Sequence, residues 1–120
     1  MIIIKRVYDN IDSDYKKILV DRLWPRDISK EKLNLDLWAK DIAPTNELRK
    51  EFNHDETKFD YFKEKYIDEL NHNQYAIDFK NKYKDENIIL LYSAKNYKYN
   101  NAIVLKEWLE KWGYSSERDI

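Results

Sequence analysis

Ile88-Ile89-Leu90-Leu91-Tyr92 is a continuous apolar run that follows a polar break in the chain. Such a run is typical of a strand buried on both faces in the middle of a sheet. We therefore expect it to form the central strand. Apolar residues at helical spacing then mark a closing helix, namely Ala102, Ile103, Leu105, Trp108, Leu109 and Trp112. Asn100 or Asn101 is expected to cap this helix, and Gly113 to end it.

Two earlier segments are also typical of strands, because they are rich in β-branched and aromatic residues. The first covers residues 2–8 and the second residues 17–24, where Pro25 should end the strand because proline cannot donate to a ladder. The connection between them is short for a crossover helix, so we expect these two strands to pair antiparallel.

A third strand is predicted over residues 35–41, after a single helical turn capped by Ser29. Leucines alternate here at period two, at positions 33, 35 and 37. Trp38 breaks the alternation, so a helix is the alternative for this segment.

Aromatic residues at spacings of three and four predict two amphipathic helices in the middle of the chain. The first carries Phe59, Phe62, Tyr66 and Leu70, the second carries Tyr75, Phe79 and Tyr83, and residues 71–73 separate them. We interpret both stripes as faces that pack into the core. Thr45 is expected to cap a preceding helix that carries Leu48 and Phe52, and Asp55 to cap the next one. The pattern predicts a single α/β domain over residues 1–120, with a small, mostly parallel or mixed sheet flanked by helices.

Composition excludes several classes of function. The 120 residues include one glycine, so the glycine-rich phosphate loops of nucleotide-binding enzymes are absent. The absence of cysteine excludes disulfides and thiolate metal sites, and two histidines cannot by themselves make a three-histidine zinc site. The first residues have apolar side chains before basic ones, the reverse of a signal peptide, and no run reaches about 18 apolar residues. We expect a cytoplasmic protein with no membrane association, no cofactor and no metal site.

Ligands of open α/β sheets bind beyond the carboxyl ends of the strands, and two segments fit that position. In Val20-Asp21-Arg22-Leu23-Trp24-Pro25-Arg26, two arginines suited to bidentate binding of phosphate or carboxylate follow a buried strand. Asp21 is placed to orient one of them. Residues 93–101 hold two lysines and no acid between the central strand and the closing helix, whose first backbone amides favour an anion.

Each of these signals has a structural alternative. An arginine that pairs with Asp21, Asp27 or Asp41 would be a brace within the fold. Ser93 has no neighbouring histidine or nucleophile-elbow glycine, which makes it a weak nucleophile candidate. Tryptophans at positions 24 and 38 could stack on nucleic-acid bases, but burial in the core is the more common role of such side chains.

The chain resembles the YeaO-like proteins, a bacterial family known as domain of unknown function 488. The resemblance rests on several blocks in the family's order, among them residues 20–26 (VDRLWPR), 36–44 (DLWAKDIAP), 52–55 (FNHD), 90–95 (LLYSAK) and 100–105 (NNAIVL). It implies a small, single-domain, cytoplasmic α/β protein of a family without an established reaction.

The resemblance also implies that the shared residues line one pocket, namely Arg22, Arg26, Lys40, Arg49, His54, Lys95 and Asn100. His54 is the one weak candidate for a catalytic base at neutral pH. The chain departs from the family pattern at three positions: Asp27 replaces a usual glycine, Asn96 an acidic residue and Tyr99 a histidine. Binding of an anion survives these changes better than acid-base catalysis does.

We therefore expect a protein that binds a phosphate- or carboxylate-bearing ligand at the strand ends, with Arg22 and Arg26 as anchors. Lys95 and the helix start at residues 100–101 would hold the opposite side. The alternatives are a nucleic-acid accessory protein and a non-catalytic interaction module in which the arginines and tryptophans are structural. The sequence leaves open whether a reaction follows binding and whether the chain forms oligomers.

Overall fold

The computed structural model describes residues 1–118, and the side chains of residues 1–111. Four strands form one sheet in the order β1-β4-β2-β3, and every neighbouring pair is parallel. They are β1 (Ile2–Arg6), β2 (Lys16–Leu19), β3 (Leu37–Trp38) and β4 (Ile88–Tyr92). The prediction that residues 88–92 form the central strand is confirmed, since β4 has β1 on one side and β2 on the other.

All five residues of β4 are buried, and they alternate between two apolar clusters. Ile88, Leu90 and Tyr92 belong to the larger cluster, which also holds the apolar faces of the long helices. Ile89 and Leu91 belong to a smaller cluster on the opposite face of the sheet. This double burial explains why the strand has no polar position.

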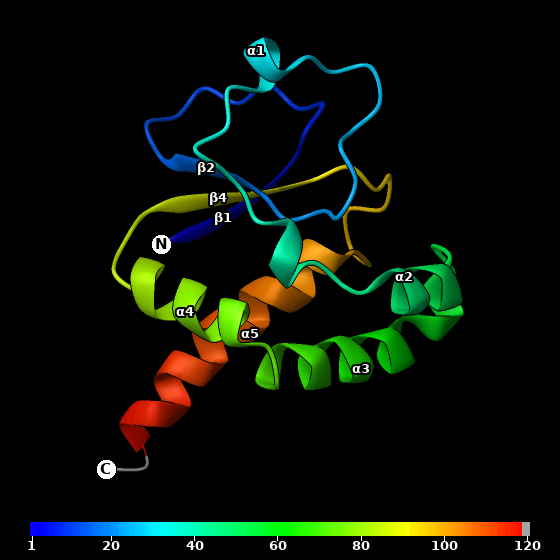
Figure 1. The fold of residues 1–120 in the computed structure, drawn as a ribbon, viewed down its shortest axis with the longest axis vertical. Helices are drawn as coiled ribbons and strands as arrows, with labels where there is room; N and C mark the ends of the chain where they lie inside the picture. The colour runs from blue at the N-terminus through cyan, green and yellow to red at the C-terminus, as the bar shows by residue number, and fades with distance from the viewer. Residues whose placement is uncertain (119–120) are drawn as a thin grey trace.

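The helices are distributed unequally over the two faces of the sheet. In Figure 1, α3 (Phe59–Asn71), α4 (Gln74–Tyr83) and α5 (Asn101–Arg118) lie on one face. The short α1 (Lys30–Leu33) and long loops lie on the other. A 3₁₀ turn η1 (Lys40–Ile42), α2 (Asn46–Phe52) and a second 3₁₀ turn η2 (Glu56–Lys58) connect β3 to α3.

Most of the expected local signals form as predicted. The side chains of Ser29, Thr45 and Asp55 accept hydrogen bonds from backbone N–H groups at the starts of α1, α2 and η2. Asn100 Oδ1 accepts from the N–H of Ile103 at 3.0 Å, which makes Asn100 the cap of α5. The stripe at residues 59, 62, 66 and 70 is buried throughout, as predicted.

The expected antiparallel pairing of the first two strands is wrong. β1 and β2 do not pair with each other but lie parallel on either side of β4. The connection at residues 7–15 contains no helix, yet it reaches the far side of β4 because β2 is one strand further across the sheet. A short connection excludes a crossover helix; it does not exclude parallel strands that share a neighbour.

Four smaller predictions are also corrected. β2 ends at Leu19, five residues before Trp24, and the third strand shrinks to two residues before η1 begins. Tyr75 is 66% exposed, because Ala76 takes the buried position on α4 instead. α5 continues through Gly113 to Arg118, since glycine weakens a helix without necessarily ending it. The side chain of Trp112 lies outside the described residues.

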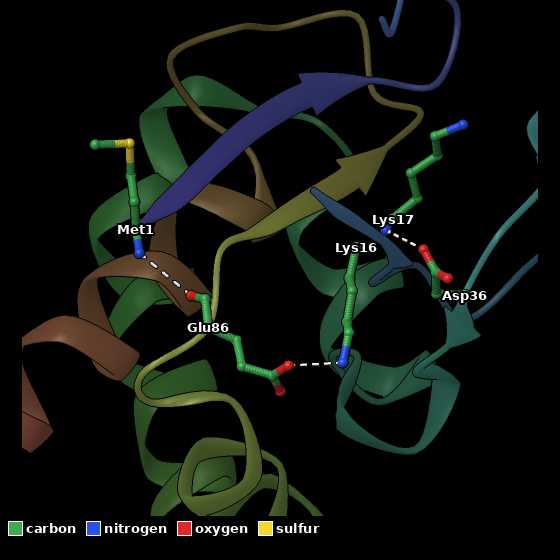
Figure 2. A network of polar contacts seen from close by, with 5 residues as sticks. All are labelled: Met1, Lys16, Lys17, Asp36 and Glu86. Carbon is green, nitrogen blue, oxygen red and sulfur yellow. Dashed lines mark hydrogen bonds and ion pairs between the residues drawn. The ribbon is translucent and has the colours of Figure 1, made fainter. Parts of the chain in front are cut away.

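Polar contacts join the amino ends of all four strands (Figure 2). The Met1 amino group donates to the backbone carbonyl of Glu86 at 3.2 Å, and the Glu86 carboxylate pairs with Lys16 Nζ at 2.6 Å. On the other side of Lys16, the N–H of Lys17 donates to Asp36 Oδ2 at 2.8 Å. Because all neighbouring strands are parallel, the four carboxyl ends lie together at the opposite edge of the sheet. No helix within residues 1–118 is long and apolar enough to cross a bilayer.

Candidate functional site

A cavity of about 650 Å³ lies at the carboxyl ends of the strands. The loops that follow β1, β2 and β4 line it, together with α2 and the start of α5. Six of the seven residues expected to share a pocket are in its lining: Arg22, Arg26, Arg49, His54, Lys95 and Asn100. This volume lies within the range of roughly 300–1,000 Å³ that is typical of small-molecule sites.

Lys40 is the seventh of these residues, and it is not in the lining of the cavity. It is exposed on η1, and its ammonium group lies 5.0 Å from the ring centre of Trp38. The turn after β3 carries Lys40 away from the cavity, so the structure does not bring it together with the other six.

Arg22 is a brace rather than a free cation. Its Nε donates to the carbonyl of Pro44 and its Nη2 donates to the carbonyl of Ala43, each at 3.0 Å. The guanidinium therefore ties the loop after β2 to the turn between η1 and α2. No ion pair between Arg22 and an acidic side chain occurs within the described residues. The acceptors are backbone carbonyls, which a sequence pattern does not reveal.

Arg6 makes a matching brace on the other side of β4, and the sequence analysis missed it. Its Nε donates to the carbonyl of Ala94 at 2.9 Å and its Nη2 to the carbonyl of Ser93 at 3.2 Å. Its guanidinium carbon also lies 4.8 Å from the ring centre of Tyr8. The available signal was a basic residue at the end of a short apolar run. The expected antiparallel pairing placed that residue at the wrong edge of the sheet.

Asp21 forms the polar floor of the cavity. Its Oδ2 accepts hydrogen bonds from the N–H of Ser93 at 2.9 Å and from Ser93 Oγ at 2.7 Å. Its Oδ1 accepts from Asn101 Nδ2 at 3.1 Å. Burial raises the pKa of Asp21 above its ordinary value of 3.8, while these hydrogen bonds and the nearby His54 act in the opposite direction. Asp21 therefore orients Ser93 and Asn101, and not an arginine as expected.

Three basic side chains remain at the rim: Arg26, Arg49 and Lys95. All three are exposed, and none forms an ion pair within the part of the chain that the structure describes. Arg49 has one long hydrogen bond of 3.4 Å, from Nη2 to Asn46 Oδ1. In total the lining holds five arginine or lysine side chains against two aspartates, so the cavity carries a local excess of positive charge.

Apolar side chains form the walls of the cavity. Phe52 and Phe62 stack with ring centres 4.4 Å apart, and Pro44 lies in the same lining. Trp24 lines the cavity too, but its Nε1 donates to the carbonyl of Ile28 at 2.7 Å and its ring packs edge-on against Trp38 at 5.4 Å. Both tryptophans are therefore held by the fold.

His54 follows α2 with a backbone φ of 56°, in the left-handed region. Its ring lies 6.4 Å from that of Phe52, and it is exposed at the cavity. No group of three or more histidine, aspartate or glutamate side chains within the described residues could hold a metal ion.

The three departures from the family pattern have separate structural roles. Asp27 has a φ of 61°, the backbone region that glycine adopts most readily, which explains why glycine suits this position. Asn96 Oδ1 accepts from the N–H groups of Lys98 and Tyr99, so it shapes the loop before α5. The Tyr99 ring packs 5.0 Å from Phe59. Neither Asn96 nor Tyr99 is in the cavity lining.

Comparison with known proteins places this chain in a family. A family model described as the inactive DUF488-N3 subclade matches residues 1–119. The chain belongs to the DUF488 family. Among the relatives of this DUF488 protein, the uncharacterized protein YeaO of Escherichia coli is 48% identical over 107 residues, which cover 88% of this chain and 93% of the relative.

Two mycobacterial relatives match a shorter part of this DUF488 protein. Uncharacterized proteins Rv3073c of Mycobacterium tuberculosis and Mb3100c of Mycobacterium bovis are each 43% identical over 68 residues, which cover 56% of this chain and 58% of each relative. No solved structure matches the chain. The resemblance seen in the sequence blocks is thus confirmed at the level of the family.

Proposed function

We propose that this DUF488 protein binds a small molecule that carries a phosphate or carboxylate group, in the cavity at the strand ends. The observation that carries the proposal is the set of three rim cations, Arg26, Arg49 and Lys95, which have no acidic partner within the described residues. Guanidinium groups bind such anions with two parallel hydrogen bonds. The braces made by Arg6 and Arg22 fix the loops that carry Lys95 and Arg26 and the turn that leads into α2, which carries Arg49.

Binding without a reaction is the function that we favour. The matching family model carries the description inactive. The Ser93 hydroxyl donates to a carboxylate that two further N–H groups also engage, which leaves the hydroxyl committed to the frame of the cavity. His54 is the one histidine in the lining, and it is exposed to solvent.

Isothermal titration calorimetry tests the proposal with inorganic phosphate, hexyl phosphate and hexanoate as probes. The variant Arg26→Gln/Arg49→Gln removes two rim cations. The matched control Lys30→Gln/Lys50→Gln removes the same charge from exposed positions outside the lining. We expect the first variant to bind about tenfold more weakly or worse, since a hydrogen bond to a charged group contributes roughly 1.5–3 kcal/mol. The control should bind as the wild type does.

Two results would contradict the proposal. Equal affinity in the two double variants would show that the rim cations do not hold the anion. The cavity would be excluded as an anion site if the wild type bound none of these probes and neither sorbitol 6-phosphate nor gluconate. A parallel titration with a single-stranded oligonucleotide separates the alternative of nucleic-acid binding. If the protein binds nucleic acid, the logarithm of the association constant falls steeply and linearly with the logarithm of the salt concentration. The slope is set by the number of phosphates that the protein contacts.

A further inference from the structure

The Asp21 carboxylate at the floor of the cavity has an acceptor position that an anion without a hydrogen-bond donor cannot use. A carboxylate offers about four acceptor positions on its two oxygens. Ser93 fills two positions on Asp21 Oδ2, and Asn101 fills one on Oδ1. No further donor within the described residues takes the last position on Oδ1, and Asp21 belongs to the cavity lining. The ligand itself can supply the fourth donor.

The charge of the cavity decides between the two common kinds of donor, a hydroxyl and a protonated amine. Arg6 and Arg22 belong to the same lining and are fixed by their backbone contacts, and three further cations line the rim. An ammonium group on the ligand would meet this excess of positive charge in a confined site, where repulsion between like charges is strong. A hydroxyl group also donates to a carboxylate, and it carries no charge for the surrounding cations to repel.

The size of the cavity supports a ligand larger than inorganic phosphate. About 650 Å³ is many times the volume of roughly 30 Å³ that one water molecule occupies in the liquid. Phe52, Phe62 and Pro44 supply apolar walls against which a carbon skeleton can pack. The floor acceptor and the rim cations thus recognise two different groups of one molecule.

Extending the proposed function, on which this step rests, we infer that the ligand is an anionic polyol, with a hydroxyl group on Asp21 Oδ1 and its phosphate or carboxylate on the rim cations. Sugar phosphates and sugar acids share this chemistry. Asp21 then serves two roles: it joins the loop after β2 to Ser93 and Asn101, and it selects hydroxylated ligands.

Titration of the wild-type protein with matched pairs of probes tests the inference without any substitution. Sorbitol 6-phosphate and hexyl phosphate have the same number of carbon atoms and the same phosphate, and they differ in hydroxyl groups; gluconate and hexanoate make the same comparison for a carboxylate. We expect the hydroxylated member of at least one pair to bind about tenfold tighter or more, as expected for a hydrogen bond to a charged group. The pair that shows the preference identifies the anion.

Two variants locate the preference. Asp21→Asn should abolish it by weakening sorbitol 6-phosphate binding about tenfold, while hexyl phosphate binding changes less than about twofold. The control Asp27→Asn removes the same charge from the exposed aspartate of the lining and should retain the preference. Because Asp21 also holds Ser93 and Asn101, circular dichroism must show that Asp21→Asn is folded. If it is not, the wild-type pairs decide alone.

The failures are distinguishable. The polyol inference is overturned if neither hydroxylated probe binds tighter than its partner, that is, sorbitol 6-phosphate than hexyl phosphate or gluconate than hexanoate. If binding in that case still requires Arg26 and Arg49, the anion site stands. A preference that survives unchanged in folded Asp21→Asn also overturns the assignment. If none of the four probes binds, the proposed function fails, and the inference with it.

Discussion

Replacing Arg22 with alanine is expected to lower the free energy of unfolding by about 2–4 kcal/mol. The side chain donates two hydrogen bonds at 3.0 Å to the carbonyls of Ala43 and Pro44, at the turn that leads into α2. Ala43 is 4% exposed, so its carbonyl has little access to water once the guanidinium is gone. The substitution thus removes two charge-assisted bonds and leaves buried acceptors unpaired.

The magnitude follows from the number and environment of these bonds. A hydrogen bond to a charged group contributes roughly 1.5–3 kcal/mol, so two such bonds set an upper range of about 3–6 kcal/mol. Arg22 is only half-buried, and solvent replaces part of the lost interaction, which reduces the expectation to about 2–4 kcal/mol. At roughly 4 °C for each kcal/mol in a domain of this size, the midpoint of thermal unfolding should fall by about 10 °C.

Urea unfolding followed by tryptophan fluorescence measures the change, with Arg26→Ala as the matched control. Arg26 is exposed, and its side chain makes no hydrogen bond or ion pair within the described residues. The control should therefore stay within about 0.5 kcal/mol of the wild type. Arg22→Lys should recover less than half of the loss, because one ammonium group cannot reproduce the planar fork. An Arg22→Ala protein as stable as Arg26→Ala would refute the brace.

Two further perturbations test the frame of the cavity. Burial raises the pKa of Asp21 in the folded protein above its ordinary value of 3.8. Between pH 3.8 and the folded-state pKa, the folded protein therefore binds more protons than the unfolded chain. The contribution of Asp21 to stability is accordingly largest below pH 3.8 and falls as pH rises through the folded-state pKa. The unfolding free energy of the wild type minus that of Asp21→Asn, from urea titrations, should accordingly be larger at pH 4 than at pH 7; a difference independent of pH would contradict the shift. Asn100→Ala should cost about 1–2 kcal/mol in the same assay, since it removes the cap on Ile103 N–H and the bond to the Asn96 carbonyl, whereas exposed Asn10→Ala should cost almost nothing.

Local features of the fold were predictable because their causes are local. The caps at Ser29, Thr45 and Asp55 form with backbone groups two or three residues away. The buried positions of α3 recur at helical spacing, and the apolar run of β4 indicates a strand covered on both faces. Each of these signals lies within a few residues of the structure that it specifies.

The strand order was not predictable in the same way, because β4 pairs with β1 and β2 across more than 70 residues of chain. A nine-residue connection at residues 7–15 is compatible with either direction of the second strand. β1 and β2 are parallel because each of them pairs parallel with β4, which lies between them. The wrong pairing also hid the structural role of Arg6. This residue ends β1, and the end of β1 lies at the same edge of the sheet as the ends of β2 and β4 only when the strands are parallel.

The block at residues 20–26 divides into side chains that hold the frame of the cavity and one cation, Arg26, that is exposed in its lining. Asp21, Arg22 and Trp24 make hydrogen bonds within the protein: the carboxylate to Ser93 and Asn101, the guanidinium and the indole N–H to backbone carbonyls. Arg26, at the end of the same block, has no such side-chain partner within the described residues. Sequence reasoning assigned the same ligand role to Arg22 and Arg26, because residue type and spacing do not report which donors the fold has already used.

This division has a physical consequence for binding. A floor fixed by three hydrogen bonds to Asp21, and loops fixed by the Arg6 and Arg22 braces, need little reorganisation when a ligand enters. The free energy lost to ordering is then confined to the rim side chains, Arg26, Arg49 and Lys95, at roughly 0.5–1.5 kcal/mol for each side chain immobilised. A preorganised frame with exposed cations at its mouth fits the binding role proposed above.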